Sequence, residues 1–194
     1  VKPQRHKTIN VSKEIKPNYM QKNALESLDN LRKNNKDKAL LISATGTGKT
    51  YLAAFDVKAV HPKRILFVVH RRSIAIKAME TFKTIIKDKS MGLFSGDNRD
   101  IDCDYIFATI QTIYKPENRQ LFSKEEFNYI IIDEVHKAGA NSYQELVNYF
   151  KPQFLLGMSA TPERTDDFDI YKMFDYNIAY EIRLQQAMEY DLLC

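Results

Sequence analysis

Cysteine is scarce in this sequence, and no stretch of it is hydrophobic enough to cross a membrane. Its two cysteines, Cys103 and Cys194, form no C-x-x-C pair and no cluster with histidine. The sequence therefore supports neither a disulfide scaffold nor a Cys/His metal site, and a reducing compartment is expected. No apolar run approaches the roughly 20 residues that a membrane-spanning helix needs. Residues 1–6 lead into no apolar segment, so we expect no secretory signal and a cytoplasmic location.

The chain also lacks internal repeats, low-complexity segments and a strong excess of charge. Its 194 residues carry a net charge of +4 at pH 7. This mildly basic balance is compatible with a polyanionic partner, but a solvated surface of mixed charge explains it equally well. The length is enough for one domain with a substantial core and too short for a second full α/β domain.

Short apolar stretches alternate with amphipathic segments along most of the chain, which is typical of an α/β fold. The run Tyr-Ile-Ile-Ile at 129–132 is continuously apolar, as in parallel strands that are covered on both faces. This alternation predicts right-handed crossovers and a three-layer parallel sheet. Ser142 and Glu145 have the spacing of a capping box at the start of a helix. We expect strands at 38–43, 64–69, 91–94, 105–109, 129–133, 154–158 and from 178, and helices at 19–32, 51–59, 71–87, 117–122, 142–150 and from 184.

A glycine turn between the first expected strand and its helix has the composition of a phosphate-binding loop. Two glycines let the backbone approach an anion closely, and free N–H groups at the helix start point toward it. Lys49 would reach the β- and γ-phosphates, and Thr50 would offer its hydroxyl to Mg²⁺. Ser43 stands where the general pattern has glycine, so a chance turn after a strand is the alternative. The predicted nucleotide-binding residues of the loop are Thr45, Gly46, Thr47, Gly48, Lys49 and Thr50.

An acidic pair closes the buried strand at 129–133. Asp133 can hold Mg²⁺, directly or through its water shell. Glu134 can orient and deprotonate the water that attacks a γ-phosphate. A solvated Asp-Glu pair at a strand end is the alternative, and the phosphate loop upstream favours the catalytic interpretation.

Every polar motif follows directly after an expected strand. In a parallel sheet the carboxyl ends of the strands share one edge, and ligands bind there. The shared placement therefore favours one functional site over a set of unrelated turns. The motifs are 43–50, His70-Arg71-Arg72, Ser95-Gly96, Thr109-Ile110-Gln111, Asp133-Glu134 and Ser159-Ala160-Thr161.

Together the motifs resemble those of superfamily 2 helicases and translocases of the DEAD/DEAH (DExH) type, which are built on RecA-like domains. The resemblance covers nearly the whole chain and implies a three-layer α/β P-loop NTPase domain at 19–183. It also implies an N-terminal arm at 1–18 and, at 184–194, the start of a linker to a second RecA-like domain. The segments 67–71 and 157–164 are most similar to the motor subunits of type III and type I restriction enzymes, which translocate on duplex DNA.

The resemblance implies ATP and Mg²⁺ as ligands, with Lys49, Asp133 and Glu134 as the catalytic residues. Gln21 would read the adenine edge. The segment 16–21, Lys-Pro-Asn-Tyr-Met-Gln, departs from the tighter R-P-Y-Q spacing, so an exposed helix glutamine is the alternative. The family pattern also assigns coupling residues: His136 would couple the nucleotide site to nucleic acid, and Ser159 and Thr161 would link hydrolysis to domain movement.

Nucleic-acid contacts would come from the loops after the other strands. Hydroxyl, amide and guanidinium groups suit contacts to phosphate and sugar, which position a protein without reading sequence. An ordinary solvated helix start is the alternative for the two arginines. The expected contact residues to DNA are His70, Arg71, Arg72, Ser95, Gly96, Thr109, Gln111 and Thr112.

The leading hypothesis is thus the N-terminal ATP-binding core of a nucleic-acid-dependent ATPase, with weak activity when isolated. The second core would supply an arginine finger, which contributes on the order of 10³–10⁵ to the rate. A catalytically silent RecA-like module and a P-loop NTPase of another class are the alternatives. Ser43 favours the first alternative, and the lack of an Asn-Lys-x-Asp guanine motif weighs against a GTPase.

Overall fold

A computed structural model describes residues 14–43, 48–135, 141–160 and 170–182. Within them, eight strands form one sheet in the order β4-β3-β5-β2-β6-β7-β1-β8. Neighbouring strands of this sheet run parallel, except that β3 and β4 are antiparallel. The strands are β1 (Lys38–Ser43), β2 (Ile65–Val69), β3 (Met91–Ser95), β4 (Asn98–Arg99), β5 (Tyr105–Thr109), β6 (Tyr129–Ile132), β7 (Phe154–Ser159) and β8 (Ile178–Ile182).

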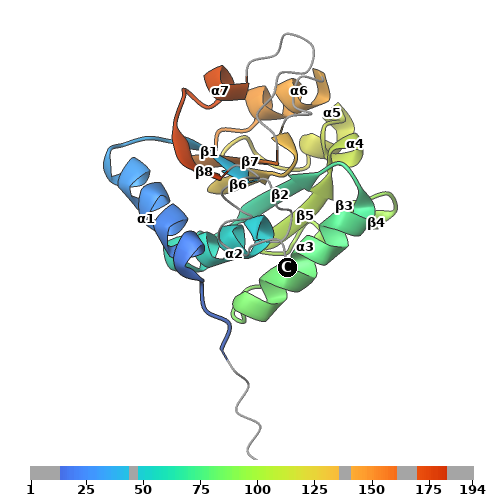
Figure 1. The fold of residues 1–194 in the computed structure, drawn as a ribbon. Coiled ribbons are helices and arrows are strands. Elements are labelled where there is room, and N and C mark those ends of the chain that lie inside the picture. The colour runs from blue at the N-terminus through green and yellow to red at the C-terminus, as the bar shows by residue number, and fades with distance from the viewer. Residues whose placement is uncertain (1–13, 44–47, 136–140, 161–169, 183–194) are drawn as a thin grey trace, which may run out of the picture.

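Helices cover both faces of the sheet, which confirms the predicted three-layer α/β architecture (Figure 1). One face carries α1 (Tyr19–Lys33), α2 (Lys49–Val60) and α3 (Arg72–Ile85). The other carries α4 (Ile110–Ile113), α5 (Pro116–Arg119), α6 (Asn141–Tyr149) and α7 (Ile170–Met173). No helix in the described part of the chain is both long and apolar enough to span a bilayer.

Alternation along the strands divides the core into two layers. In β2, Ile65, Phe67 and Val69 pack under α1–α3, while Leu66 and Val68 pack on the opposite side. Because both faces are dry, a central strand must be apolar at every position, and β2 is buried throughout. Each such side chain contributes roughly 1.5–3 kcal/mol of burial free energy. Polar groups are thereby confined to the ends of the strands.

The expected strands are all present, with ends shifted by one residue at most where they are described. The turn Gly96-Asp97 joins β3 to the short strand β4, in a segment for which no strand was predicted. Gly96 has φ +55°, a conformation that glycine adopts without strain. The short helices α4 and α7 were not predicted, and α5 lies at 116–119 rather than 117–122.

Two of the shifted helix starts change the role expected of a residue. Helix α6 begins at Asn141, so Ser142 lies inside the first turn and is not the N-cap. Helix α3 begins at Arg72, and Arg71 is its extended N-cap without a capping side-chain bond. A one-residue shift is enough to move a side chain from the cap to the helix surface. Residues 1–13 of the predicted arm at 1–18, and the predicted helix from 184, lie outside the described residues.

Gly157 lies in the middle of β7, where the ring of Phe174 packs directly against its backbone. A Cβ atom at this position would collide with three atoms of that ring. Phe174 is fully buried, so the ring has little room to move away.

We predict that Gly157→Ala lowers the free energy of unfolding by about 1–3 kcal/mol through overpacking. Urea denaturation measures the change. In a Phe174→Leu background the same substitution should cost clearly less, because the smaller side chain leaves space for the methyl group. An equal cost in both backgrounds would contradict the packing explanation.

Candidate functional site

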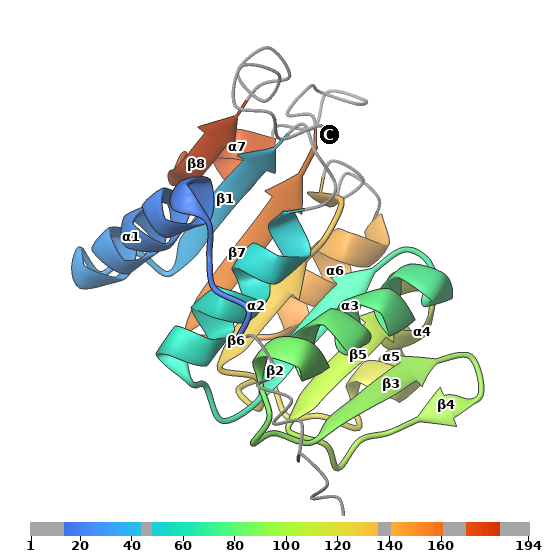
Figure 2. The same ribbon diagram turned by 60° about the horizontal axis from the view of Figure 1, so that its bottom comes forward.

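The carboxyl ends of four neighbouring strands gather four of the six predicted motifs on one edge of the sheet. Strands β2, β6, β7 and β1 are adjacent in that order and parallel (Figure 2). Ser159, which is fully buried, closes β7 and pairs with Ile42 of β1. The loop before Lys49 and the acidic pair at Asp133 therefore follow strands that flank β7. Adjacent strands are about 4.8 Å apart, so the two motifs start about 10 Å from each other.

Lys49 is the first residue of α2 and is 4 % exposed. Its Nζ atom is buried and has no hydrogen-bond partner among the described residues. A buried ammonium without a partner is costly, because it has lost its water without gaining an acceptor. The N-cap of α2, Gly48, makes no side-chain capping bond. The N–H groups of the first turn of α2 and the ammonium therefore fit a bound anion such as a triphosphate.

Gln21 lies in the first turn of α1, next to the N-terminus of α2. Its backbone N–H donates to Asn18 Oδ1 at 2.8 Å, and its Oε1 accepts from the Asn18 N–H at 2.9 Å. This reciprocal pair is a capping box. Gln21 Nε2 also donates to the carbonyl of Gly48 at 3.4 Å. The glutamine is therefore not a free surface side chain, and it joins α1 to the start of α2.

The acidic pair follows β6 through a sharp backbone turn. The N–H of Asp133 donates to the Val68 carbonyl at 2.9 Å, which extends the ladder to β2 by one residue. Asp133 Oδ1 accepts from the Glu134 N–H at 2.9 Å, and the Asp133 side chain is buried. Glu134 has φ +55°, in the left-handed region. Such a conformation costs a non-glycine residue about 1–2 kcal/mol and recurs at functional sites.

Tyr143, in the first turn of α6, belongs to this site although its sequence context gave no sign of it. Burial, with the charges of Asp133 and Glu134, raises the pKa of its hydroxyl to about 12. The phenol therefore keeps its proton near neutral pH. Its hydroxyl is buried and has no hydrogen-bond partner in the described part of the structure.

The predicted nucleic-acid residues separate into a buried and an exposed group. Ser95, Thr109 and Thr112 are buried, and Thr109 Oγ1 lies 2.9 Å from Ser95 Oγ and 3.1 Å from Thr112 Oγ1. The Gly96 N–H donates to Thr112 Oγ1 at 3.3 Å. These hydroxyls tie the turn after β3 to the helix after β5. The exposed group is Arg71, Arg72, Gly96 and Gln111, and His70, the eighth predicted residue, is half-buried.

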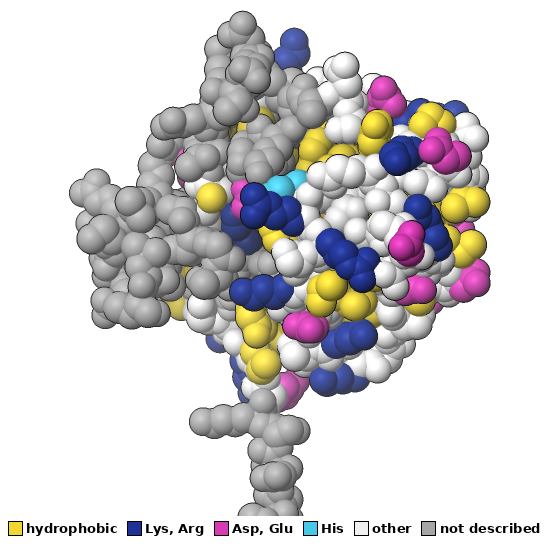
Figure 3. Space-filling view, turned by 90° about the vertical axis from the view of Figure 1, so that its right-hand side faces the viewer, with side chains coloured by type: hydrophobic (Ala, Val, Ile, Leu, Met, Phe, Trp, Pro, Cys, Tyr) yellow, Lys and Arg dark blue, Asp and Glu magenta, His cyan; other side chains and the backbone are white. Residues whose placement is uncertain are grey.

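Two bonds fix members of the exposed group. Arg72 Nη1 donates to the Ser95 carbonyl at 3.1 Å, and Gln111 Nε2 donates to the His70 carbonyl at 2.8 Å. A cavity of about 540 Å³ opens beside them and is lined by His70, Ile110, Gln111, Tyr114, Asn141, Ser142, Tyr143 and Glu145. Lys and Arg side chains are spread over the side of the molecule that carries α3 and β4 (Figure 3).

Some predicted site residues lie outside the described part of the chain: Thr45, Gly46, Thr47, His136 and Thr161. Thr50 is half-buried in the first turn of α2. Among the described residues, no group of three or more His, Cys, Asp or Glu side chains could hold a metal ion. A Mg²⁺ ion bound with a nucleotide needs fewer protein ligands, because phosphates and water fill its remaining positions.

The parallel sheet and the strand–turn–helix unit at its edge define a RecA-like α/β domain. The chain belongs to the family described as "Type III restriction enzyme, res subunit", whose model matches residues 14–164. Members of this group and their helicase relatives share an ATPase domain of the helicase and restriction-motor kind. The resemblance to superfamily 2 helicases, and to restriction-enzyme motors among them, is thereby confirmed.

Two relatives illustrate the breadth of the family. The chain is 31 % identical over 189 residues to the type I restriction enzyme EcoAI endonuclease subunit of Escherichia coli, covering 89 % of this chain and 22 % of that protein. It is 30 % identical over 168 residues to the putative ATP-dependent helicase IRC3 of Saccharomyces cerevisiae, covering 78 % and 24 %. The chain thus spans about a quarter or less of either relative.

Solved structures share the fold at lower identity. The type ISP restriction-modification enzyme LlaGI, solved as a nuclease-deletion mutant with a DNA substrate mimic, matches with a TM-score of 0.71 and 20 % identity. That match covers 92 % of this chain and 21 % of LlaGI. The helicase domain of Hef from Pyrococcus furiosus matches with a TM-score of 0.65 and 20 % identity, covering 82 % and 37 %.

We predict that the left-handed backbone at Glu134 makes Glu134→Gly more stable than Glu134→Ala, by about 1 kcal/mol, because glycine adopts this conformation without strain. Thermal or urea unfolding measures the difference. At Glu145, inside α6, the order should reverse, because glycine weakens a helix by about 1 kcal/mol relative to alanine. Alanine as the more stable variant at both positions would show that Glu134 stores no backbone strain.

Proposed function

We propose that this chain is the N-terminal ATP-binding core of a nucleic-acid-dependent ATPase, a helicase or translocase that hydrolyses ATP to move on DNA. The buried, unpartnered ammonium of Lys49 is the observation that carries this proposal. Lys49 begins α2 at the same edge of the sheet as Asp133 and Glu134. A cation held ready for an anion, beside two carboxylates, suits the binding and hydrolysis of a triphosphate.

In this proposal α2 and its first residue hold the phosphates. Lys49 neutralises charge on the β- and γ-phosphates, and the N–H groups of Gly48 and the next residues donate to phosphate oxygens. Gln21 would present its amide to the adenine edge, and its bond to the start of α2 at Gly48 supports this role. ATP binding would then involve both α1 and α2.

The acidic pair has two roles. Asp133 and the Thr50 hydroxyl are oxygen ligands for Mg²⁺, which when bound neutralises charge on the phosphates. Glu134 orients the attacking water and accepts its proton, and its left-handed backbone is a strained feature of the kind that recurs at functional sites. Tyr143 stays a neutral donor beside both carboxylates.

The nucleic-acid surface in this proposal is the exposed group of Arg71, Arg72, Gly96 and Gln111. The buried hydroxyls of Ser95, Thr109 and Thr112 act behind it, because they hold the turn after β3 against α4. These groups reach phosphates and sugars, so binding would depend on charge more than on sequence. The DNA substrate mimic bound to LlaGI supports this choice of polyanion.

Full activity in this proposal requires a second RecA-like domain of the same polypeptide. The relatives are several times longer than this chain, which supports further domains. Loss of an arginine finger lowers the hydrolysis rate by on the order of 10³–10⁵. The 194 residues alone would therefore bind ATP with Mg²⁺ and hydrolyse it very slowly.

We predict that Lys49→Met removes the stabilisation that Mg·ATP gives the chain, while the stability without nucleotide stays equal or rises by about 1–3 kcal/mol. The rise is expected because the substitution removes a buried ammonium that has no hydrogen-bond partner among the described residues. Thermal unfolding with and without Mg·ATP measures both effects.

Lys58→Met, at an exposed site of the same helix, is the matched control and should keep the nucleotide effect. In a protein with both domains, Glu134→Gln should keep ATP binding and lose DNA-stimulated hydrolysis. Retained Mg·ATP stabilisation in Lys49→Met would contradict the proposed site. Binding with no hydrolysis in the complete wild-type protein would favour the catalytically silent module.

We predict that Arg71→Ala combined with Arg72→Ala weakens binding to duplex DNA. The slope of log K against log salt concentration should become shallower by about 0.9 for each phosphate that the variant no longer neutralises. Fluorescence anisotropy at several salt concentrations measures it. Lys83→Ala with Lys87→Ala, near the other end of α3, is the control for net charge. Equally weakened binding in the two double variants would show that the DNA surface is assigned wrongly.

A further inference from the structure

A buried polar cluster on the opposite edge of the sheet joins three elements of the nucleotide site. Arg32 of α1 donates from Nη1 to Asp56 Oδ1 at 2.8 Å and from Nη2 to Asp56 Oδ2 at 2.5 Å. The hydroxyl of Tyr129, the first residue of β6, donates to Asp56 Oδ2 at 2.6 Å. We call Arg32, Asp56 and Tyr129 the clamp.

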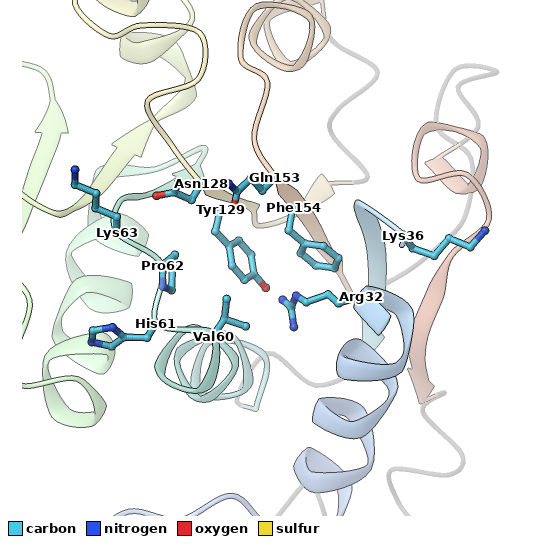
Figure 4. Close-up of a pocket in the computed structure, with 10 residues that line it drawn as sticks. All are labelled: Arg32, Lys36, Val60, His61, Pro62, Lys63, Asn128, Tyr129, Gln153 and Phe154. Carbon is cyan, nitrogen blue, oxygen red and sulfur yellow. The ribbon is translucent and has the colours of Figure 1, made fainter. Parts of the chain in front are cut away.

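Two of the three clamp residues are almost closed to solvent, and the side chain of Arg32 is 20 % exposed. Asp56 is 2 % exposed and Tyr129 is 1 % exposed. The guanidinium of Arg32 lies 4.1 Å from the ring centroid of Phe154 and 5.3 Å from that of Tyr129. Figure 4 shows Arg32, Tyr129 and Phe154 together at a cavity of about 410 Å³. Burial, and then the charge of Asp56, raises the pKa of Tyr129 well above its ordinary value, so the phenol remains a donor.

Each of the three elements carries a nucleotide-site residue at its other end. Along α1, Gln21 is about 16 Å from Arg32, and along α2, Lys49 is about 10 Å from Asp56. Along β6, Asp133 is about 13 Å from Tyr129. The clamp thus joins α1, α2 and β6 at one end, and the residues proposed to bind the nucleotide lie toward the other end of each element.

We propose that Arg32, Asp56 and Tyr129 are positioning residues for the nucleotide site, because their bonds fix how α1 and α2 lie against β6. This inference rests on the proposed ATP site. A two-pronged Arg–carboxylate pair has one favourable geometry, so it resists rotation of α2 and sliding of α1. Apolar packing alone tolerates such shifts more readily. A buried ion pair adds little stability compared with apolar side chains of the same volume, so orientation is its distinctive contribution.

The neighbouring strand offers a matched control for Tyr129. Tyr105 is the first residue of β5, as Tyr129 is of β6, and both pair with Ile65 of β2. Tyr105 is fully buried, and its hydroxyl donates to the carbonyl of Pro62 at 3.1 Å. Removal of either hydroxyl therefore deletes one buried hydrogen bond, but only that of Tyr129 belongs to the clamp.

The test compares Mg·ATP affinity with thermal stability in the 194-residue chain, by calorimetric titration and thermal unfolding. Tyr129→Phe should raise the Kd for Mg·ATP about tenfold, as the loss of a supporting bond behind a binding site often does. Tyr105→Phe should leave that Kd within about twofold of the wild type. Its drop in melting temperature should be similar to that of Tyr129→Phe. Equal changes in Kd for the two variants, or none, would overturn the proposal.

A second variant separates stability from positioning. Arg32→Met, Asp56→Leu and Tyr129→Phe together replace the clamp by apolar groups and should restore most of the melting temperature. The Kd for Mg·ATP should stay about tenfold raised. Recovery of nucleotide affinity together with stability would show that the clamp serves the fold alone. Absence of Mg·ATP binding in the wild-type chain would instead overturn the proposed function.

Discussion

The burial of both faces of a parallel sheet is the constraint on which the rest of this structure depends. Strands such as β2 and β6 contribute only apolar side chains between the helix layers, so polar groups can lie only at the two ends of the strands. At the carboxyl edge these are Lys49, Asp133 and the hydroxyls after β3 and β5. At the amino edge they are the clamp residues. The same dry interior makes each buried charge dependent on a partner.

Helix α2 shows this dependence in two opposite ways. Asp56 is buried, and its charge is matched by Arg32 and the hydroxyl of Tyr129. Lys49, two turns earlier in the same helix, is also buried but has no hydrogen-bond partner among the described residues. The charge of Asp56 is balanced by other side chains of the chain, whereas the charge of Lys49 fits a bound anion. The left-handed backbone of Glu134 is a second energetically unfavourable feature at the carboxyl edge of the sheet. Stability given up at such positions is a common feature of functional sites.

Much of the fold was accessible from the sequence because its elements are strongly patterned. The apolar runs of β1, β2, β5 and β7 and the helical spacing in α1 and α3 indicated their places to within a residue or two. The short elements were missed, since β4 and α4 contain too few residues to show a period. The start of α6 was also misplaced by one residue. Ser142 and Glu145 have the spacing of a capping box, but the helix begins at Asn141. The capping box of Asn18 and Gln21 was legible in the sequence as an Asn followed three residues later by Gln.

The sequence by itself determined which residues follow strands, because the alternation of apolar and polar side chains and the residue types of turns are local features that involve only a few neighbouring positions. It was therefore enough to predict the α/β class and the position of the polar motifs after the strands. Only the tertiary structure decided which polar groups are buried and what they meet. Ser95, Thr109 and Thr112 bond to one another, Tyr143 lies beside the acidic pair, and Arg32, Asp56 and Tyr129 converge from three elements. Burial and partnership arise from contacts between distant segments, and no local pattern records them.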